Sequence, residues 1–151
     1  MRITLPVIAL ACVLAPWSAR AEKKVIAPPE FVRTGPPAPM FSPGILADGT
    51  LYVSGQLGSD LKTRTVPDDF EAEVKNCLDS AGIILKAAGM SYDDVVSVQI
   101  FLTDISLFQK MNGVYASVFK EPRPARTTVG VAKLAAAGAR VEINMIAHKA
   151  H

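Results

Sequence analysis

The chain has 151 residues, 16 of them basic and 14 acidic, and a formal net charge of +2. This length predicts a single domain. The near balance of charge, with no long run of lysine or arginine, argues against nucleic acid or an anionic membrane surface as a partner. We therefore expect a small molecule as the ligand, no nucleic-acid partner and no stable insertion into a membrane.

The segment 1–21 has the pattern of a secretory signal peptide. Arg2 supplies a positive charge, residues 3–16 are largely apolar, and a small-x-small triplet ends at Ala21, after which we expect cleavage. The apolar part is short and contains two prolines, so a membrane span is disfavoured and an uncleaved anchor is only the alternative. We expect a periplasmic or secreted chain of about 130 residues with balanced charge.

Proline dominates the next segment, 22–43, which contains six prolines between positions 28 and 43. Proline lacks an amide donor and biases the preceding residue toward extended backbone. We therefore expect an extended arm without a regular helix, and a folded domain that spans 44–151.

Cys77 is the single cysteine that remains after cleavage, because Cys12 lies in the signal segment. A lone cysteine cannot form an internal disulfide, even in an oxidising compartment. It falls within an apolar pattern of helical period, which favours a buried small hydrophobic residue over a reactive thiol.

Apolar periodicity predicts the elements of the domain in chain order. On the second strand Val96, Val98, Ile100 and Leu102 are expected to share the buried side, and Gly89 is expected to end the first helix in a left-handed cap. The predicted elements are strand 50–55, helix 70–88, strand 94–103, helix 107–119 with Asp104 or Ser106 as its cap, strand 127–133 and strand 140–147.

This order of elements predicts an α+β fold with one sheet and two helices packed on one face. Two helices cannot cover both faces of a sheet whose strands are this apolar. Self-association is the simplest way to cover the other face. The chain also contains no glycine-rich phosphate-binding loop.

Two charged residues in the last strands are candidates for chemistry. In an extended strand Arg126 and Thr128 point to one side, where the small Gly130 leaves space, and Glu142 lies inside the final strand. Each residue also has an ordinary explanation: Arg126 could cap a strand or pair with a surface acid, and Glu142 could lie on a solvated face. Because Arg126 and Glu142 occur together in an otherwise apolar sheet, a functional role and the ordinary explanations are equal alternatives.

The expected strand directions separate these two residues. If the last two strands are antiparallel, Arg126 and Glu142 lie about five residues, or about 17 Å, apart along the sheet. One subunit would then not bring them together. If they serve one site, we expect that site between subunits, and a pocket shared by both side chains within one chain would contradict this hypothesis.

Four segments of the chain, in order, resemble those of the RidA (YjgF) family of enamine/imine deaminases. They are "LYVSGQLG", "AAGMSYDDVVSVQIFLTDISLFQKMNGVYASVF", "PARTTVGVAKL" and "VEINMIA", within 41–147. The resemblance implies a homotrimer of chorismate-mutase-like α+β fold, with a single mixed sheet and clefts between subunits. It also implies hydrolysis of 2-imino acids, or their enamine tautomers, to 2-oxo acids and ammonia without a metal or an organic cofactor.

The same resemblance suggests roles for individual residues. Arg126 matches the arginine that would hold a substrate carboxylate in a bidentate manner, and Glu142 matches the glutamate that would hold or activate water. The remaining matches are Gly55, whose carbonyl could place the water or the imine nitrogen, Asn112 at the edge of the helix stripe, and Phe108 as pocket wall or ordinary core.

Two positions depart from the family pattern. Phe41 stands where a tyrosine is usual, and Thr128 where a cysteine is frequent. Roles that need a phenol or a thiol at these positions are excluded, so the sequence supports only a water-based mechanism. The alternative function is a non-catalytic trimer that binds a small carboxylated metabolite or acts as a chaperone-like surface. His148 and His151 are interpreted as tail residues, because no third metal ligand accompanies them.

Overall fold

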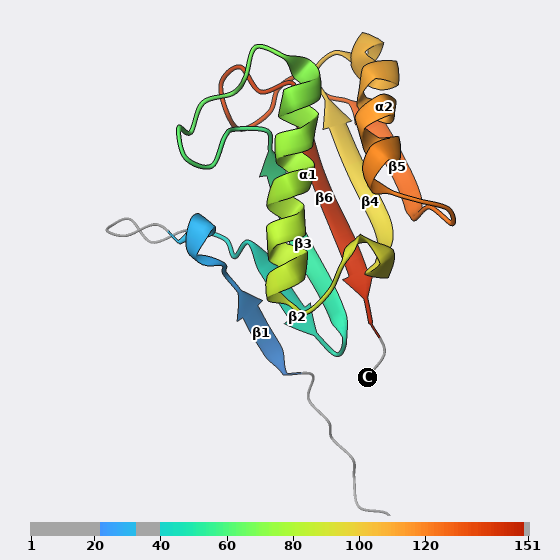
Figure 1. Ribbon diagram of the computed structural model, residues 1–151. Helices are drawn as coiled ribbons and strands as arrows, with labels where there is room; N and C mark the ends of the chain where they lie inside the picture. Colours follow the sequence, from blue (N-terminus) through green and yellow to red (C-terminus); the bar gives the residue numbers. More distant parts are fainter. Residues whose placement is uncertain (1–21, 33–39, 150–151) are drawn as a thin grey trace, which may run out of the picture.

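The computed structural model describes residues 22–32 and 40–149. The predicted signal segment 1–21 and residues 33–39 of the predicted arm lie outside the described residues. The described chain forms one sheet, with both α-helices packed on the same face (Figure 1). The predicted α+β class is therefore confirmed.

The strands pair in the order β1-β2-β3-β6-β4-β5, and all neighbours are antiparallel except β4 and β5, which are parallel. Three short 3-10 helices accompany the main elements. In chain order the elements are β1 (Lys23–Ile26), η1 (Pro29–Phe31), β2 (Gly44–Ala47), β3 (Thr50–Leu57), α1 (Phe70–Ala87), η2 (Tyr92–Asp94), β4 (Val95–Leu102), η3 (Ile105–Leu107), α2 (Phe108–Val118), β5 (Ala125–Gly130) and β6 (Val141–His148).

Two strands, β1 and β2, have no counterpart among the elements predicted from periodicity. β2 and β3 form a hairpin whose turn residues, Asp48 and Gly49, have φ angles of 45° and 71°. An Asp-Gly pair favours this turn, so the signal for the hairpin was present in the sequence. β1 lies within the predicted arm 22–43, which is extended at its start as expected but pairs with β2 as the edge of the sheet.

Helix α1 follows the sequence prediction closely. The Asp69 carboxylate caps its first turn by accepting from the backbone N–H groups of Glu71 and Ala72, and Gly89 follows its end with a φ of 73°. Cys77 is fully buried on this helix, which confirms the predicted hydrophobic environment. Burial raises the pKa of the Cys77 thiol well above its usual range, so the thiol stays neutral.

Two β-bulges make the observed strands β3 and β4 differ from the predicted ones. β3 does not stop at Gly55 but continues to Leu57 through a register shift between Val53 and Gln56. In β4 a shift next to Val95 inverts the alternation there, so Val95 is buried and Val96 is 49% exposed. A bulge adds one residue to one strand and moves its neighbours to the other side. The assignment of Val96 to the buried side was therefore wrong.

Helix α2 begins at Phe108, after the 3-10 turn η3. Asp104 caps η3 rather than α2: its carboxylate accepts a hydrogen bond of 2.9 Å from the backbone N–H of Ser106, whereas Leu107 precedes α2 without a side-chain cap. The side-chain and backbone hydrogen bonds from Ser106 lower the pKa of Asp104. Within the described ranges, no helix has both the length and the apolar character needed to cross a membrane.

Candidate functional site

Arg126 lies on the helix-facing side of β5, against α2. It pairs in register with Val98 of β4, which is completely buried beneath the helices, and paired residues point to the same face of a sheet. The guanidinium carbon lies 4.7 Å from the centre of the Tyr115 ring and 5.6 Å from that of the Phe108 ring. The flat guanidinium is thus held over two aromatic rings, an arrangement that limits its mobility.

A groove of about 480 Å³ opens beside Arg126, between α2 and the segment that leads into β5. It is lined by Asn112, Tyr115, Ala116, Arg123, Pro124 and Arg126. Phe108, Asn112 and Tyr115 are spaced by four and three residues on α2, so all three lie on the helix face toward β5. The structure thus brings predicted residues Arg126, Asn112 and Phe108 together.

Buried oxygens at this place have no hydrogen-bond partner among the described residues: Asn112 Oδ1, Tyr115 Oη and Thr128 Oγ1. All three belong to α2 or β5. A buried polar atom without a partner costs about 1–3 kcal/mol, and such atoms are rare in native structures. Water, a ligand or another subunit would relieve this cost, which marks the α2–β5 region as a candidate for binding.

Tyr115 connects this helix face to the charges of the groove. Burial raises the pKa of its phenol, and the nearby positive charges of Arg126 and Arg123 act in the opposite direction. The hydroxyl therefore stays protonated at neutral pH and can donate a hydrogen bond. Tyr115 lies inside the predicted helix 107–119 and was given no role there, because an aromatic residue at helical spacing gives no signal that separates a core position from a wall of a site.

Glu142 lies on the opposite, helix-free face of the sheet. Its neighbours Val141 and Ile143 are fully buried toward the helices, so the side chain of Glu142 points the other way. A Cβ atom on Gly55 would lie 1.8 Å from Oε1 of Glu142. The carboxylate therefore occupies the space that the missing side chain of Gly55 leaves, at the bulge of β3.

The segment that carries Phe41 is anchored next to this glycine. The Ser54 hydroxyl donates a hydrogen bond of 2.6 Å to the carbonyl of Ser42, and the Ser54 backbone N–H donates one of 3.0 Å to the carbonyl of Pro43. The Phe41 side chain itself is 68% exposed in the single chain. Phe41 thus belongs to the part of the fold that holds Gly55 and Glu142.

The predicted site residues therefore form two groups on opposite faces of the sheet. Arg126 is level with Val98 of β4, and Glu142 is level with Phe101 of the same strand. The offset is three residues, or about 10 Å along the strands, with about 10 Å more across two strand spacings. The offset of five residues expected from the sequence was too large, because β5 ends at Gly130, level with the start of β6, and does not run to residue 133 as predicted.

Because Arg126 and Glu142 lie on opposite faces of the sheet, their side chains do not face a common pocket within the described part of a single chain. The condition that would have contradicted a site between subunits is therefore not met. That site remains a prediction, and it would require Arg126, Asn112, Phe108 and Thr128 from one chain and Glu142, Gly55 and Phe41 from another.

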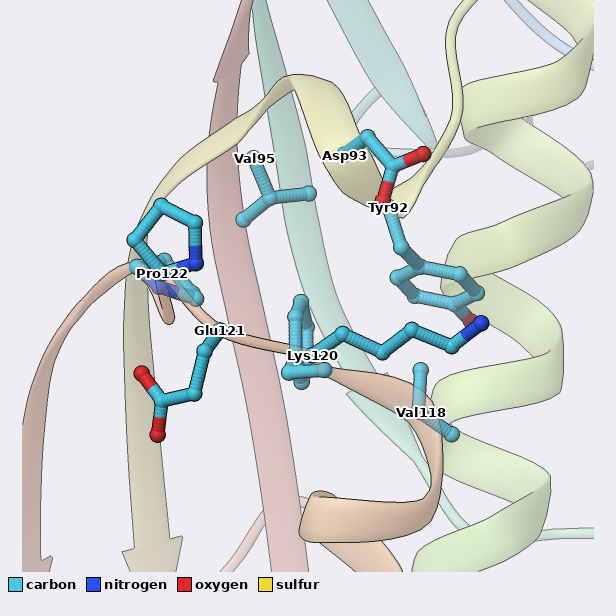
Figure 2. Close-up of a pocket in the computed structure, with 9 residues that line it drawn as sticks. Tyr92, Asp93, Val95, Val118, Lys120, Glu121 and Pro122 are labelled. Carbon is cyan, nitrogen blue, oxygen red and sulfur yellow. The ribbon is translucent and has the colours of Figure 1, made fainter.

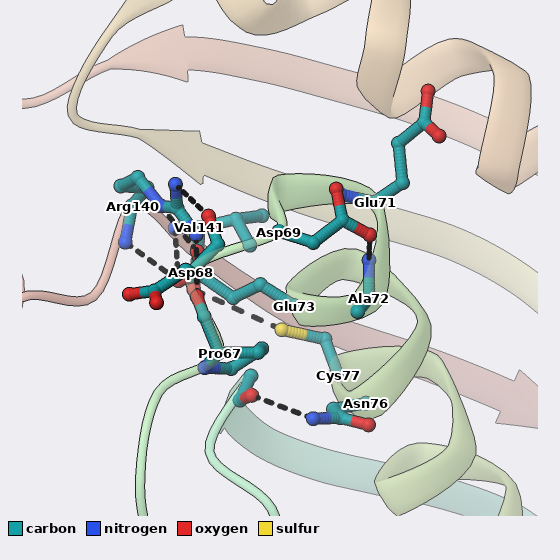
Figure 3. Close-up of polar contacts among 11 residues, drawn as sticks. Pro67, Asp68, Asp69, Glu71, Ala72, Glu73, Asn76, Cys77, Arg140 and Val141 are labelled. Atoms are coloured by element: carbon teal, nitrogen blue, oxygen red, sulfur yellow. Dashed lines mark hydrogen bonds and ion pairs between the residues drawn. The ribbon is translucent and has the colours of Figure 1, made fainter.

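A buried ion pair that sequence reasoning missed joins α1 to the start of β6. Glu73 is fully buried, and its carboxylate accepts from Arg140 Nε at 2.7 Å and from the Arg140 backbone N–H at 2.6 Å (Figure 3). Arg140 also donates to the carbonyls of Pro67 and Asp68, at 2.7 and 2.9 Å. These contacts tie the segment that leads into β6 to the start of α1 and to the loop that precedes this helix.

A further pocket of about 300 Å³ lies next to the C-terminal end of α2 (Figure 2). It is lined by Tyr92, Asp93, Val95, Val118, Phe119, Lys120, Glu121, Pro122 and Pro124. The rings of Tyr92 and Phe119 meet edge to face, with their centres 5.3 Å apart. None of the residues predicted for the site lines this pocket. In the described residues no group of three or more His, Cys, Asp or Glu side chains could hold a metal ion.

Comparison with known proteins shows which family the chain is similar to. A family model described as "Endoribonuclease L-PSP" matches residues 33–149. A 2-iminobutanoate/2-iminopropanoate deaminase of Bos taurus is 43% identical over 108 residues, which cover 71% of this chain and 78% of that protein. A RutC family protein of Sulfurisphaera tokodaii is 40% identical over 114 residues, covering 75% of this chain and 90% of that protein.

Solved structures give the same picture. The crystal structure of RidA from the Antarctic bacterium Psychrobacter sp. PAMC 21119 has a TM-score of 0.71 and 35% identity, and covers 82% of this chain and 94% of that one. A putative endoribonuclease L-PSP from Entamoeba histolytica has a TM-score of 0.75 and 34% identity, and covers 85% of this chain and 100% of that one.

Proposed function

Because the chain belongs to the RidA family, we propose that it hydrolyses 2-imino acids, or their enamine tautomers, to 2-oxo acids and ammonia. We place the reaction in a cleft between subunits of a homotrimer. The similarity to a protein named 2-iminobutanoate/2-iminopropanoate deaminase supports the reaction. The separation of Arg126 and Glu142 on opposite faces of one sheet supports the position between subunits.

The observation that carries the proposal is the position of Arg126 over the Tyr115 and Phe108 rings at the edge of an open groove. A guanidinium fixed in this way can bind a carboxylate through two parallel N–H···O bonds. It would hold the imino acid by its carboxylate and orient the adjacent C=N carbon. Orientation of this kind lowers the barrier by removing the freedom that the reactants would otherwise lose.

Glu142 of a neighbouring chain would supply the base. Its carboxylate would take a proton from water as the water oxygen adds to the C=N carbon and the electron pair moves to nitrogen. Return of that proton to nitrogen gives a carbinolamine. Transfer of its hydroxyl proton to nitrogen, as the C–N bond breaks, releases ammonia and leaves the 2-oxo acid. The only other reactant is water. The scheme needs neither a phenol at the position of Phe41 nor a thiol at the position of Thr128.

The test is the hydrolysis rate of 2-iminobutyrate or 2-iminopropionate, generated in place by an amino-acid oxidase and competed against trapping by semicarbazide. Acceleration by the purified chain should disappear in Arg126→Ala and fall strongly in Glu142→Gln. A folded protein that does not accelerate hydrolysis would instead favour the binding of a carboxylated metabolite. A parallel incubation with RNA tests the activity that the family description names.

We further propose export with cleavage after Ala21, which leaves the imines to be supplied outside the cytoplasm. The proposal is based on the composition of the first 21 residues. Mass spectrometry of the chain recovered from a bacterial periplasm or culture medium should find Glu22 as the first residue. Recovery of the full chain from the cytoplasm would contradict export.

A further inference from the structure

We propose that the groove between α2 and β5 takes substrates with two anionic groups, Arg126 holding the carboxylate next to the imine and Arg123 holding a second one. The inference rests on the proposed function and narrows its substrate class to 2-imino dicarboxylic acids, the imines of acidic amino acids. An oxidation of the α-amine of such an amino acid would have to supply them.

The lining of the groove carries this proposal. Two of its side chains are arginines and none is an acid, and the rest are Asn112, Tyr115, Ala116 and Pro124. Arg123 and Arg126 are separated by two residues and both line this groove, and the Arg126 guanidinium carbon lies 4.7 Å from the centre of the Tyr115 ring. Two like charges that line one groove favour an anionic ligand.

The groove also offers neutral polar groups. Asn112 Oδ1 and Tyr115 Oη are both buried and have no hydrogen-bond partner within the described residues. The Tyr115 hydroxyl can donate to the second carboxylate, which 2-iminobutyrate lacks, and the Asn112 amide oxygen can accept from an imine N–H. With a volume of about 480 Å³ the groove has room for a five-carbon dicarboxylate.

Arg123 has an ordinary explanation, an ion pair with Glu121. Both side chains are exposed, by 43% and 73%, and exposed pairs of this kind contribute little to stability. A guanidinium has five N–H donors, so Arg123 can bind a ligand while it keeps, or exchanges, its contact with Glu121. Glu121 then competes with the second carboxylate of the substrate for Arg123. Removal of the Glu121 charge should therefore increase the affinity for a dicarboxylate, whereas removal of Arg123 should decrease it.

The experiment measures binding of the stable products, 2-oxoglutarate and 2-oxobutyrate, by calorimetry on the purified chain in its assembled state. We expect 2-oxoglutarate to bind roughly tenfold more tightly, the increment typical of one charge-assisted pair. Arg123→Ala should remove this preference and leave the affinity for 2-oxobutyrate within about twofold. Glu121→Gln should increase the affinity for 2-oxoglutarate alone.

Equal affinity for the two oxo acids, no binding of either, or an equal loss of both in Arg123→Ala would overturn the inference. Arg123 is exposed, so circular dichroism should show Arg123→Ala folded, and Arg123→Lys, which keeps the charge, should retain part of the preference. The outcome is separable from the proposed function. Hydrolysis of 2-iminobutyrate without a dicarboxylate preference defeats only this inference, and a preference without hydrolysis defeats only the reaction.

Discussion

A Cβ atom on Gly55 would lie 1.8 Å from Oε1 of Glu142, so the glycine makes room for the carboxylate that we assign as the base. Gly55→Ala should therefore push Glu142 out of its place. Overpacking of this kind costs about 1–3 kcal/mol in the free energy of unfolding, and we expect most of the hydrolysis rate to be lost with it. Denaturant unfolding and the semicarbazide assay measure the two effects.

The matched control is Gly113→Ala on α2. A Cβ atom there meets nothing within 4 Å, and alanine is favoured over glycine inside a helix by about 0.5–1 kcal/mol. This variant should unfold at slightly higher denaturant concentration. If Gly55→Ala is as stable and as active as the unchanged chain, the space at Gly55 is not needed to position the Glu142 carboxylate.

Tyr115 should act as a positioning residue for Arg126, through its ring rather than its hydroxyl. Tyr115→Leu removes the ring that lies 4.7 Å from the guanidinium, and we expect KM for the imine to rise roughly threefold or more with a smaller change in kcat. Tyr115→Phe keeps the ring and should keep KM near its original value. A rise in KM that is equal in both variants would assign the effect to the hydroxyl.

The sequence was sufficient for the parts of the fold that follow a regular period. α1 and its glycine end, the buried Cys77, and the shared side of Arg126 and Thr128 were predicted from spacing alone. Arg126 and Thr128 are paired with Val98 and Ile100, two neighbours on the buried side of β4. A period of two determines which residues share a side.

The alternation along a strand does not determine whether a given set of side chains points toward the helices or away from them. Arg126 faces the helices and Glu142 faces away from them, a relation that depends on the register of β5 and β6 against β4. Register is set by contacts between strands far apart in sequence. The bulge beside Val95 was also hidden, since an extra residue leaves no mark in composition. The sequence could therefore name candidate site residues, but it could not predict on which face of the sheet each candidate lies.

The buried pair of Glu73 and Arg140 should be a major contributor to stability. Arg140→Leu leaves the Glu73 carboxylate fully buried with backbone donors alone, and we expect a loss of about 3 kcal/mol in the free energy of unfolding. Lys75→Gln is the control, because its pair with Asp79 is exposed and should contribute less than about 0.5 kcal/mol. Equal effects in denaturant unfolding would contradict the role given to the buried pair.

Alkaline stability should depend on Tyr92. Burial, with a smaller contribution from the charge of Asp79, raises the pKa of this phenol to about 12, against 10.0 for an ordinary tyrosine. The unfolded chain therefore loses this proton first as the pH rises, and ionisation favours unfolding. The contribution is fully present below pH 10.0 and is lost progressively between pH 10.0 and about 12.

Tyr92→Phe separates this effect from other alkaline transitions. The variant loses the hydrogen bond from the hydroxyl to the carbonyl of Leu78, so it should be less stable at neutral pH. Its free energy of unfolding should then fall less steeply above pH 10.0, while the raised pKa of Tyr115 still contributes. Denaturant unfolding at a series of pH values, with absorbance titration of the phenols, measures both quantities. Parallel pH profiles for the two proteins would show that Tyr92 titrates as an ordinary phenol.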